Sequence, residues 1–348
     1  MPDKINTKIL FIVPYPTQGP SNRFRVEQYL PYLKEAGIDF TLRPFYNSSI
    51  YRILYKKGNY FKNAVFLIFF TLRRIKDIFA SRLYDVTFIH REAFPSLGYL
   101  FEVFFRLFSK KLVYDFDDAV FLKKPAKTRK TIEISDYVIA GNSFLKGYAA
   151  KHNSNVAVIP TCIDTDRYKP RPRVVNNDKL VIGWIGTSFT SIYLDLLRDV
   201  FREIARRYKN VEFRIIGANF LEPGIPLVSR EWSLSTEIED LQGFDIGIMP
   251  LFDDDWAKGK CAFKIIQYMA VGIPTVASKV GMNIDVIEDG VNGFLVSDKK
   301  GWLDRLVFLI DNADIREKLG RAGRMVAETK YSVKANAPIL LELLNFRR

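Results

Sequence analysis

Short apolar segments alternate along the chain with longer stretches in which apolar residues recur every three or four positions. Six of the short segments lie before residue 165 and read as strands, because they are rich in β-branched and aromatic residues. They are KILFIV (8–13), FTLRPF (40–45), VTFIH (86–90), KLVYDF (111–116), YVIAGN (137–142) and VAVIP (156–160). Strands that alternate with helices are typical of a parallel sheet covered by helices.

The same pattern begins again after the turn-rich segment DTDRYKPRPRVVNND (164–178). The later strands are LVIGWIG (180–186), VEFRIIG (211–217), DIGIMPL (245–251), IPTVAS (273–278) and GFLV (293–296). The sequence therefore predicts an α/β protein of two doubly wound, Rossmann-like domains, with ligands at the carboxyl ends of the strands. We expect domains at residues 1–170 and 171–330, followed by a helix at 331–348.

Composition is consistent with two folded domains, since 48% of the 348 residues are apolar. Cys162 and Cys261 match neither a zinc motif nor a disulfide framework, so we expect a reducing cytoplasm and no metal site. The apolar run Ile9–Val13 is too short for a signal peptide. The run Ala64–Leu72 has nine residues, against the roughly 20 of a spanning helix, so we expect no segment that crosses a membrane.

Positive charge is concentrated in the first half of the chain. Residues 1–172 contain 28 Lys plus Arg and 15 Asp plus Glu, whereas residues 173–348 contain 24 of each. The excess predicts an anionic partner for the first half.

Much of this charge lies in residues 51–82, which hold eight basic residues and one acid among aromatic side chains. The aromatic residues are Tyr51, Tyr55, Tyr60, Phe61, Phe66, Phe69, Phe70 and Phe79. Such a segment is typical of a helix that lies in the interface of an anionic membrane. The alternative is a core helix with solvated flanks.

In the second half, GKCAFKIIQYMAVGIPTVAS (259–278) reads as a short helix that leads into a buried strand. On such a helix Lys260, Lys264 and Gln267 fall within about 60° of one another. Lysines at the start of a helix lie beside the positive end of its dipole, which is unfavourable unless an anion binds there. The alternative is an ordinary solvated face with the acidic run at 253–255 as counter-charge.

A second candidate anion site is the loop GTSFT, which follows the strand at 180–186. Gly186 and Thr187 precede a helical pattern, and backbone N–H groups at such a turn can cradle a phosphate. An ordinary capped turn would have the same residues.

These motifs together resemble the group 1 (family 4) retaining glycosyltransferases of the GT-B fold. The likeness is most specific in KGKCAFKIIQYMAVGIPTVASKVGMNIDVIEDGVNGFLV (258–296), preceded by GWIGTSFTSIYL (183–194). The first loop and helix, PYPTQGPSNRFRVEQYLPYLKEAGIDF (14–40), and YDFDDAVF (114–121) are also similar to branches of that family.

The resemblance implies that the C-terminal domain binds a nucleotide sugar, that the N-terminal domain binds the acceptor, and that the last helix crosses back to the N-terminal domain. It implies donor binding by a set of second-half residues, with Gly217 near the base and Gln267 at the position of a ribose-binding glutamate. The expected donor-binding residues are Gly186, Thr187, Gly217, Lys260, Phe263, Lys264 and Gln267.

The sequence departs from the family pattern in two motifs. Most of the family has two glutamates eight positions apart, where this chain has Gly259 and Gln267. The Arg and Lys that usually follow the first strand of the second domain are replaced by GTSFT. The lysines of the 259–278 motif are expected to take over the phosphate contacts, and loss of activity is the alternative.

Candidate catalytic residues follow two predicted strands of the first domain. His90 ends VTFIH, and Asp115 and Asp117 lie in DFDD, so all three are expected at the carboxyl edge of the sheet. A carboxylate there can orient or deprotonate an acceptor hydroxyl. Ordinary strand-end hydrogen bonding is the alternative. Arg23 and Arg25 follow the first strand and are expected to contact donor phosphates or the acceptor.

The D-x-D string formed by Asp115 and Asp117 also occurs in metal-dependent glycosyltransferases of another fold. Two doubly wound domains argue against that fold, so we expect no metal and no other cofactor.

The sequence therefore predicts a retaining glycosyltransferase that transfers a sugar from a UDP- or GDP-linked donor to a lipid-linked or polysaccharide acceptor in cell-envelope biosynthesis. We expect it to be peripheral on the inner face of the membrane. The alternatives are a GT-B nucleotide-sugar epimerase, a catalytically impaired membrane-surface protein and a nucleic-acid-binding protein. The sequence has no recognised nucleic-acid module, so we expect no nucleic-acid partner.

Overall fold

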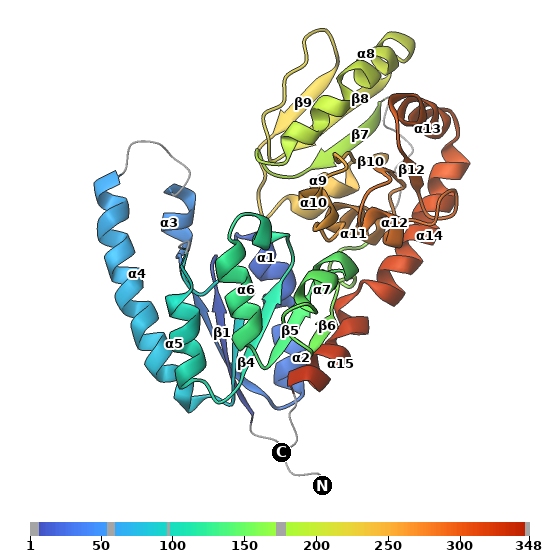
Figure 1. The fold of residues 1–348 in the computed structure, drawn as a ribbon. Helices are drawn as coiled ribbons and strands as arrows, with labels where there is room; N and C mark the ends of the chain where they lie inside the picture. The colour runs from blue at the N-terminus through green and yellow to red at the C-terminus, as the bar shows by residue number, and fades with distance from the viewer. Residues whose placement is uncertain (1–6, 54–59, 96–97, 172–178, 345–348) are drawn as a thin grey trace. The chain divides into compact units, whose positions relative to one another are not determined.

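The computed structural model describes residues 7–53, 60–95, 98–171 and 179–344. Its contacts divide the chain into two compact units. The first contains residues 1–161, 259–261 and 336–348, and the second contains residues 162–258 and 262–335. Each unit has its own six-stranded parallel sheet with helices packed against it (Figure 1), which confirms the predicted α/β architecture.

The first sheet has the strand order β2-β1-β3-β4-β5-β6. Its strands are β1 (Lys8–Val13), β2 (Asp39–Pro44), β3 (Val86–His90), β4 (Leu112–Phe116), β5 (Tyr137–Ala140) and β6 (Val156–Val158). Every residue of β3 and β4 is buried, because helices cover both faces of a parallel sheet. Their register pairs His90 with Asp115, so both residues lie at the carboxyl edge.

Helices and short 3-10 turns connect these strands. They are α1 (Pro20–Arg25), η1 (Glu27–Tyr29), α2 (Leu30–Glu35), α3 (Ser48–Ile53), α4 (Tyr60–Ala80), η2 (Ser81–Leu83), α5 (Leu100–Phe108), η3 (Val120–Leu122), α6 (Pro125–Ile134) and α7 (Ser143–Ala149). Local sequence starts two of them: Pro20 supplies the fixed φ favoured in a first helical turn, and Asn142 caps α7 by accepting from the Leu145 N–H at 2.8 Å.

The second sheet has the order β12-β11-β10-β7-β8-β9. Its strands are β7 (Leu180–Ile185), β8 (Val211–Ile216), β9 (Leu227–Arg230), β10 (Ile246–Met249), β11 (Thr275–Ser278) and β12 (Phe294–Val296). The eleven strands predicted from sequence all form, to within two residues at each end. The prediction was wrong in omitting β9, an edge strand with three exposed residues, because it has no continuous apolar run.

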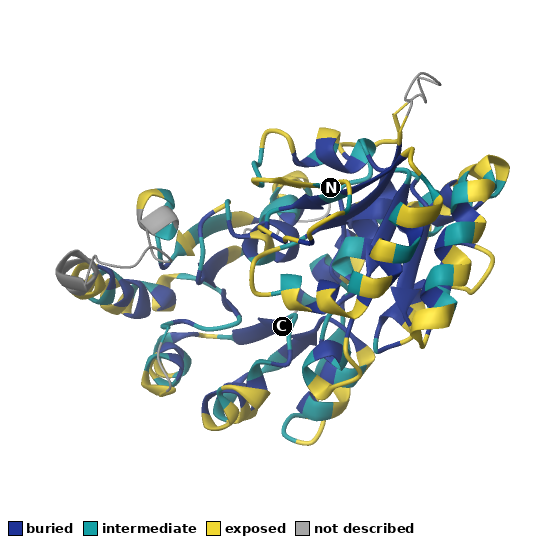
Figure 2. Ribbon diagram, turned by 90° about the horizontal axis from the view of Figure 1, so that it is seen from above, coloured by how far each residue is buried: buried dark blue, intermediate teal, exposed yellow. Residues whose placement is uncertain are grey.

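The remaining helices are η4 (Ser191–Leu197), α8 (Arg198–Arg207), α9 (Glu237–Gln242), α10 (Asp255–Lys258), α11 (Phe263–Ala270), α12 (Asn283–Val286), α13 (Lys299–Asp311), α14 (Ala313–Lys330) and α15 (Val333–Leu344). The core of the second unit includes the fully buried rings of Trp184, Phe201 and Phe213. Buried residues gather on the strands, and exposed residues lie on the outer helix faces (Figure 2). Within the described ranges, no helix combines the length and apolar character needed to span a membrane.

The chain offers a matched pair of glycines for testing this packing. A Cβ added at Gly320 in α14 would lie 2.1 Å from the carbonyl oxygen of Gly272, whereas one at Gly147 in α7 meets nothing within 4 Å. We expect Gly320→Ala to lower the free energy of unfolding by about 1–3 kcal/mol through overpacking. Gly147→Ala should raise it by about 0.5–1 kcal/mol, because alanine has the higher helix propensity. Chemical denaturation measures both, and equal effects at the two positions would contradict the packing described for α14.

Candidate functional site

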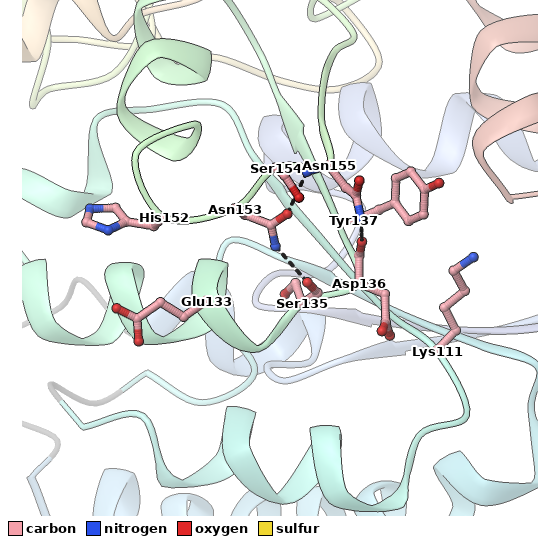
Figure 3. Close-up of a pocket in the computed structure, with 9 residues that line it drawn as sticks. All are labelled: Lys111, Glu133, Ser135, Asp136, Tyr137, His152, Asn153, Ser154 and Asn155. Atoms are coloured by element: carbon pink, nitrogen blue, oxygen red, sulfur yellow. Dashed lines mark hydrogen bonds between the residues drawn. The ribbon is translucent and has the colours of Figure 1, made fainter.

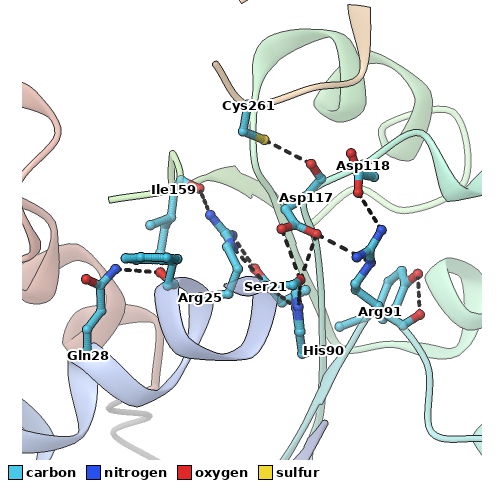
Figure 4. Close-up of polar contacts among 12 residues, drawn as sticks. Ser21, Arg25, Gln28, His90, Arg91, Asp117, Asp118, Ile159 and Cys261 are labelled. Carbon is cyan, nitrogen blue, oxygen red and sulfur yellow. Dashed lines mark hydrogen bonds and ion pairs between the residues drawn. The ribbon is translucent and has the colours of Figure 1, made fainter. Parts of the chain in front are cut away.

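A buried group of charged residues lies at the carboxyl edge of the first sheet (Figure 4). His90 ends β3, Asp115 lies beside it in β4, and Arg25 reaches them from α1. His90 Nδ1 is 2.6 Å from Asp115 Oδ2, and Arg25 Nε donates to the same oxygen at 3.2 Å. Arg25 Nη2 also pairs with the other carboxylate oxygen, and its Nη1 donates to the Ile159 carbonyl at 2.6 Å. One carboxylate therefore joins α1, β3 and β4.

Electrostatics keeps the Asp115–Arg25 pair ionised. Burial alone would raise the pKa of Asp115, but the Arg25 charge and the His90 hydrogen bond together hold that pKa below its ordinary value. Burial would lower the pKa of Arg25, and the Asp115 carboxylate raises it above its ordinary value instead. Arg25 was predicted to contact donor phosphates or the acceptor. In the structure its guanidinium is buried and binds Asp115 and the Ile159 carbonyl, both in the first unit.

Ser21 extends the group toward the second aspartate. Its hydroxyl lies 2.5 Å from His90 Nε2 and 3.1 Å from Asp117 Oδ2. Arg91 Nε lies 3.5 Å from Asp117, and Arg91 Nη2 donates to Asp118 at 2.5 Å. Burial would raise the pKa of Asp117, but the nearby positive charge of Arg91 and the Ser21 hydrogen bond contribute to lowering it. Ser21 was not predicted from sequence, because its partners His90 and Asp117 lie far from it along the chain and no motif links them to it.

The turn that presents Arg91 is conformationally unusual. Arg91 has a φ of 61°, in the left-handed region that residues other than glycine rarely adopt. Its N–H donates to the Asp115 carbonyl at 2.7 Å, and its carbonyl accepts from the Tyr114 hydroxyl at 3.0 Å. Strain of this kind concentrates at functional sites, so the turn supports a functional interpretation of the cluster.

Residues 259–261 belong to the first unit and contact the same edge. The Cys261 thiol donates to the Asp117 carbonyl at 3.1 Å, and the Lys260 carbonyl accepts from Asn142 Nδ2 at 3.0 Å. A Cβ added at Gly259 would lie 2.5 Å from the Ala119 Cβ and 2.8 Å from its nitrogen. The position therefore has no room for a side chain, which explains why glycine stands where a glutamate would be expected from the resemblance. Arg23, also predicted to contact phosphate, is buried and lies over the Phe24 ring.

The predicted face of Lys260, Lys264 and Gln267 does not form as expected. Helix α11 begins at Phe263, because Ala262 has a φ of 49° and interrupts the helical path. Lys260 therefore precedes the helix, and Gln267 is only 5% exposed. Lys264 is half-buried, and its Nζ lies 5.3 Å from the centre of the Trp184 ring.

Glycines form a close approach at the carboxyl ends of β7 and β8. A Cβ at Gly217, whose φ is 84°, would lie 2.1 Å from the Gly186 carbonyl oxygen. A Cβ at Gly186 would lie 2.4 Å from the Trp184 ring. The structure thus brings Gly186, Gly217 and Lys264 together around Trp184. Thr187 follows on the exposed loop, where its N–H donates to Thr190 Oγ1 at 3.2 Å.

A buried carboxylate lies beside Gln267. Glu237, at the start of α9, accepts from Gln267 Nε2 at 3.4 Å, from Trp232 Nε1 at 2.7 Å and from the Tyr168 hydroxyl. Trp232 in turn adjoins Gly217, since a Cβ there would lie 3.2 Å from the Trp232 Cβ. Sequence reasoning missed Glu237, because its partners are scattered along the chain and α9 carries no motif.

A polar hollow of about 530 Å³ lies at the amino ends of β4, β5 and β6 (Figure 3). Its lining includes Lys111, Asp136 and Asn155, which immediately precede or start these strands. It is at the opposite edge of the sheet from His90, and we assign it no function. Among the described residues, no group of three or more His, Cys, Asp or Glu is arranged to hold a metal ion.

Comparison with known proteins places part of the chain in a family. Residues 179–312 match the family model for "Glycosyl transferases group 1". Spore coat protein SA of Bacillus subtilis (strain 168) is 34% identical over 85 residues, which are 24% of this chain and 22% of that protein. The capsular polysaccharide biosynthesis glycosyltransferase CapM of Staphylococcus aureus is 24% identical over 183 residues, which are 49% of this chain and 47% of that protein. The chain thus aligns with less than half the length of either relative.

Solved structures cover nearly the whole chain. HepE of Anabaena in complex with UDP-glucose has a TM-score of 0.69 at 15% identity, over 97% of this chain and 99% of HepE. Sucrose-phosphate synthase from Thermosynechococcus elongatus has a TM-score of 0.72 at 13% identity, over 97% and 98% of the two chains. A glycosyltransferase from Rickettsia africae has a TM-score of 0.70 at 14% identity, over 98% of each chain. At these identities the likeness establishes the fold.

The two parallel sheets, these neighbours and the family match agree with the resemblance drawn from the motif at 258–296. The chain has the GT-B fold, and its residues 179–312 match the family model for glycosyl transferases group 1.

Proposed function

We propose that the protein is a retaining glycosyltransferase that transfers a sugar from a nucleotide-diphosphate donor to a lipid-linked or polysaccharide acceptor. The observation that carries the proposal is the group 1 domain at 179–312, in which Gly186, Gly217 and Lys264 meet around Trp184. HepE, a neighbour in fold, has been solved with UDP-glucose, which supports a nucleotide sugar as the ligand class.

The donor end of the reaction is assigned to the second unit. Glycine at 186 and 217 lets the ends of β7 and β8 approach each other closely, with both N–H groups donating to neighbouring strands. This leaves the carboxyl edge of the sheet low beside Lys264, where we place the diphosphate. Lys264 would stabilise the charge that develops on the departing diphosphate, since fixed cations act strongly on a leaving group. Phe263, Thr187 and Lys260 complete the proposed donor set.

The acceptor end is assigned to the cluster around His90. In the transfer, the bond between the anomeric carbon and the phosphate oxygen breaks, and a bond from that carbon to the acceptor oxygen forms. Asp117 has a lowered pKa and is therefore a weak base, so we assign it to orienting the acceptor hydroxyl. The proton then leaves with the phosphate oxygen. Asp115 contacts no substrate in this scheme and positions His90 and Arg25.

No resident metal is part of the proposal. Asp115 and Asp117, the residues of the D-x-D string, already engage Arg25, His90, Ser21 and Arg91. We therefore expect transfer to proceed at an unchanged rate in EDTA. Abolition of transfer by EDTA, with recovery on adding Mg²⁺ or Mn²⁺, would contradict this.

The cellular setting is proposed from the relatives. CapM is named for capsular polysaccharide biosynthesis, and such chains are built at the cell envelope. We infer that this protein acts in cell-envelope glycan or glycolipid assembly, on the inner face of the membrane.

Nucleotide binding gives a first test of the donor site. At about 100 times its dissociation constant, UDP or GDP should raise the free energy of unfolding of the wild type by about 2.7 kcal/mol. Lys260→Ala plus Lys264→Ala should lose most of this response in thermal unfolding. The matched control, Lys209→Ala plus Lys318→Ala, removes two exposed lysines of the second unit and should keep it. Equal responses in both double variants would refute the lysine assignment.

The role of Asp115 predicts a pH-dependent stability. Its pKa in the folded protein lies below the unfolded value near 3.8, so its stabilisation is complete above the unfolded value and is lost as the pH falls through the lower pKa of the folded protein. Asp115→Asn should therefore cost about 3–5 kcal/mol at pH 7, because Arg25 is left buried without its counter-charge.

Urea denaturation of both proteins at a series of pH values measures this. The difference between them should shrink as the pH falls below about 4. Exposed Asp39→Asn is the control and should change little at any pH. A difference for Asp115→Asn that stays constant down to low pH would show that the charge of Asp115 is not what stabilises the cluster.

A further inference from the structure

Helix α4 buries an ion pair and exposes several apolar residues on its outer face. Arg74 is 1% exposed and Asp77 is 7% exposed, and they form an ion pair at 3.3 Å. Arg74 also donates to the Arg43 carbonyl at 3.2 Å. Ile68 and Leu72, by contrast, are 64% and 57% exposed. A helix on the surface of a globular protein normally has the opposite arrangement.

The exposed apolar residues of α4 form a stripe. At 100° per residue, Ile68, Leu72, Ile75 and Phe79 fall within an arc of about 60° on the outer face, and all four are classed as exposed. Of the predicted aromatic residues, Phe69 and Phe79 are exposed, whereas Phe70 is buried against Phe45. Tyr55 and the side chains of Tyr60, Phe61 and Phe66 lie outside the described residues. Within α4, the predicted interfacial segment can therefore be compared with side-chain exposure only at residues 67–80.

Helix α5 repeats the inversion. Glu102 is fully buried, where it accepts from the Ala93 N–H at 2.9 Å and lies 3.2 Å from Lys127 Nζ. Leu100, Phe104 and Leu107 lie on the outer face of α5 and are exposed. The two helices are neighbours, since the rings of Phe79 and Phe108 are 4.9 Å apart (Figure 1). We call the exposed apolar residues of α4 and α5 together the α4–α5 surface.

Few acidic groups border the α4–α5 surface, and the nearby Asp85 and Asp136 are ion-paired with Lys110 and Arg106. The acids in α4, η2 and α5 are Asp77 and Glu102, and both are buried. Lys76 and Arg82 are exposed on α4 and η2. Exposed apolar residues of this extent mark an interaction surface, and a positive border favours an anionic partner. A second copy of the chain is disfavoured, because it would bring two positive borders together.

We propose that the α4–α5 surface rests on an anionic lipid bilayer. Its apolar side chains enter the boundary between headgroups and acyl chains, and Lys76 and Arg82 lie among the headgroups. Because Asp77 and Glu102 are buried, the outer faces of α4 and α5 present no acidic side chain. The inference deepens the proposed function and rests on it for the meaning of the contact, which is access to a lipid-linked acceptor.

Sedimentation with vesicles tests the surface in the full chain. The wild type should sediment with vesicles of phosphatidylcholine mixed with phosphatidylglycerol, should remain in solution with phosphatidylcholine alone, and should be released by high salt. Lys76→Gln plus Arg82→Gln should weaken binding to the mixed vesicles roughly tenfold or more. A wild type that stays in solution with both kinds of vesicle at low salt would overturn the proposal.

A matched pair of variants separates this surface from general stickiness. Leu72→Gln plus Leu107→Gln removes two exposed leucines of the α4–α5 surface, and Leu221→Gln plus Met325→Gln removes two comparably exposed residues of the second unit. The first pair should weaken vesicle binding roughly tenfold or more, and the second should leave it unchanged. Equal binding by the two would overturn the proposal. The proposal would also be overturned if the wild type were a dimer in analytical ultracentrifugation and Leu72→Gln plus Leu107→Gln converted it to a monomer.

The nucleotide response of the same variants, measured without vesicles, distinguishes this inference from the proposed function. Loss of vesicle binding by Leu72→Gln plus Leu107→Gln with stabilisation by UDP or GDP intact supports the surface. Vesicle binding by the wild type with no response to any nucleotide would keep the surface and overturn the donor site. A nucleotide response with no vesicle binding would keep the donor site and overturn the membrane-binding surface.

Discussion

The carboxylate of Asp115 is the interaction on which the candidate acceptor site depends. It is 1% exposed and binds Arg25 from α1 and His90 from β3 while lying in β4. Each of these side chains would be costly to bury alone, and the pairing holds them in one arrangement at the carboxyl edge of the sheet. His90 in turn contacts Ser21, and Ser21 and Arg91 hold Asp117, so a connected polar network extends outward from this buried charge.

Charge placement also sets the character of the first unit elsewhere. Arg74, Asp77 and Glu102 are withdrawn beneath α4 and α5, and the helices turn apolar residues outward. On this face, Lys76 and Arg82 therefore reach the surface beside apolar side chains. Residues 173–348 contain equal numbers of basic and acidic residues, and glycines lie at the carboxyl ends of β7 and β8, where the donor site is proposed.

Sequence predicted the sheets well, because buried parallel strands are continuous apolar runs that need no partner to be recognised. It also placed His90 and Asp115 at one edge, since both end or follow such runs. It could not predict the start of α11, which depends on the left-handed backbone of Ala262, or the contact between Gly259 and Ala119. Glu237 and Ser21 were missed for a related reason: their partners are far away in sequence, and single residues of these types carry no pattern.

We propose that the donor site of the second unit and the His90 cluster serve one transfer reaction. The most direct test of this proposal is phosphorus NMR of UDP- and GDP-linked sugars incubated with the protein and with vesicles of envelope lipid extract. We predict that one donor is converted to its nucleoside diphosphate only when the extract is present, and that Asp117→Asn slows this about 100-fold or more while still binding the nucleotide. A folded wild type that consumes no donor, or that converts a donor to another sugar nucleotide without an acceptor, would contradict the account.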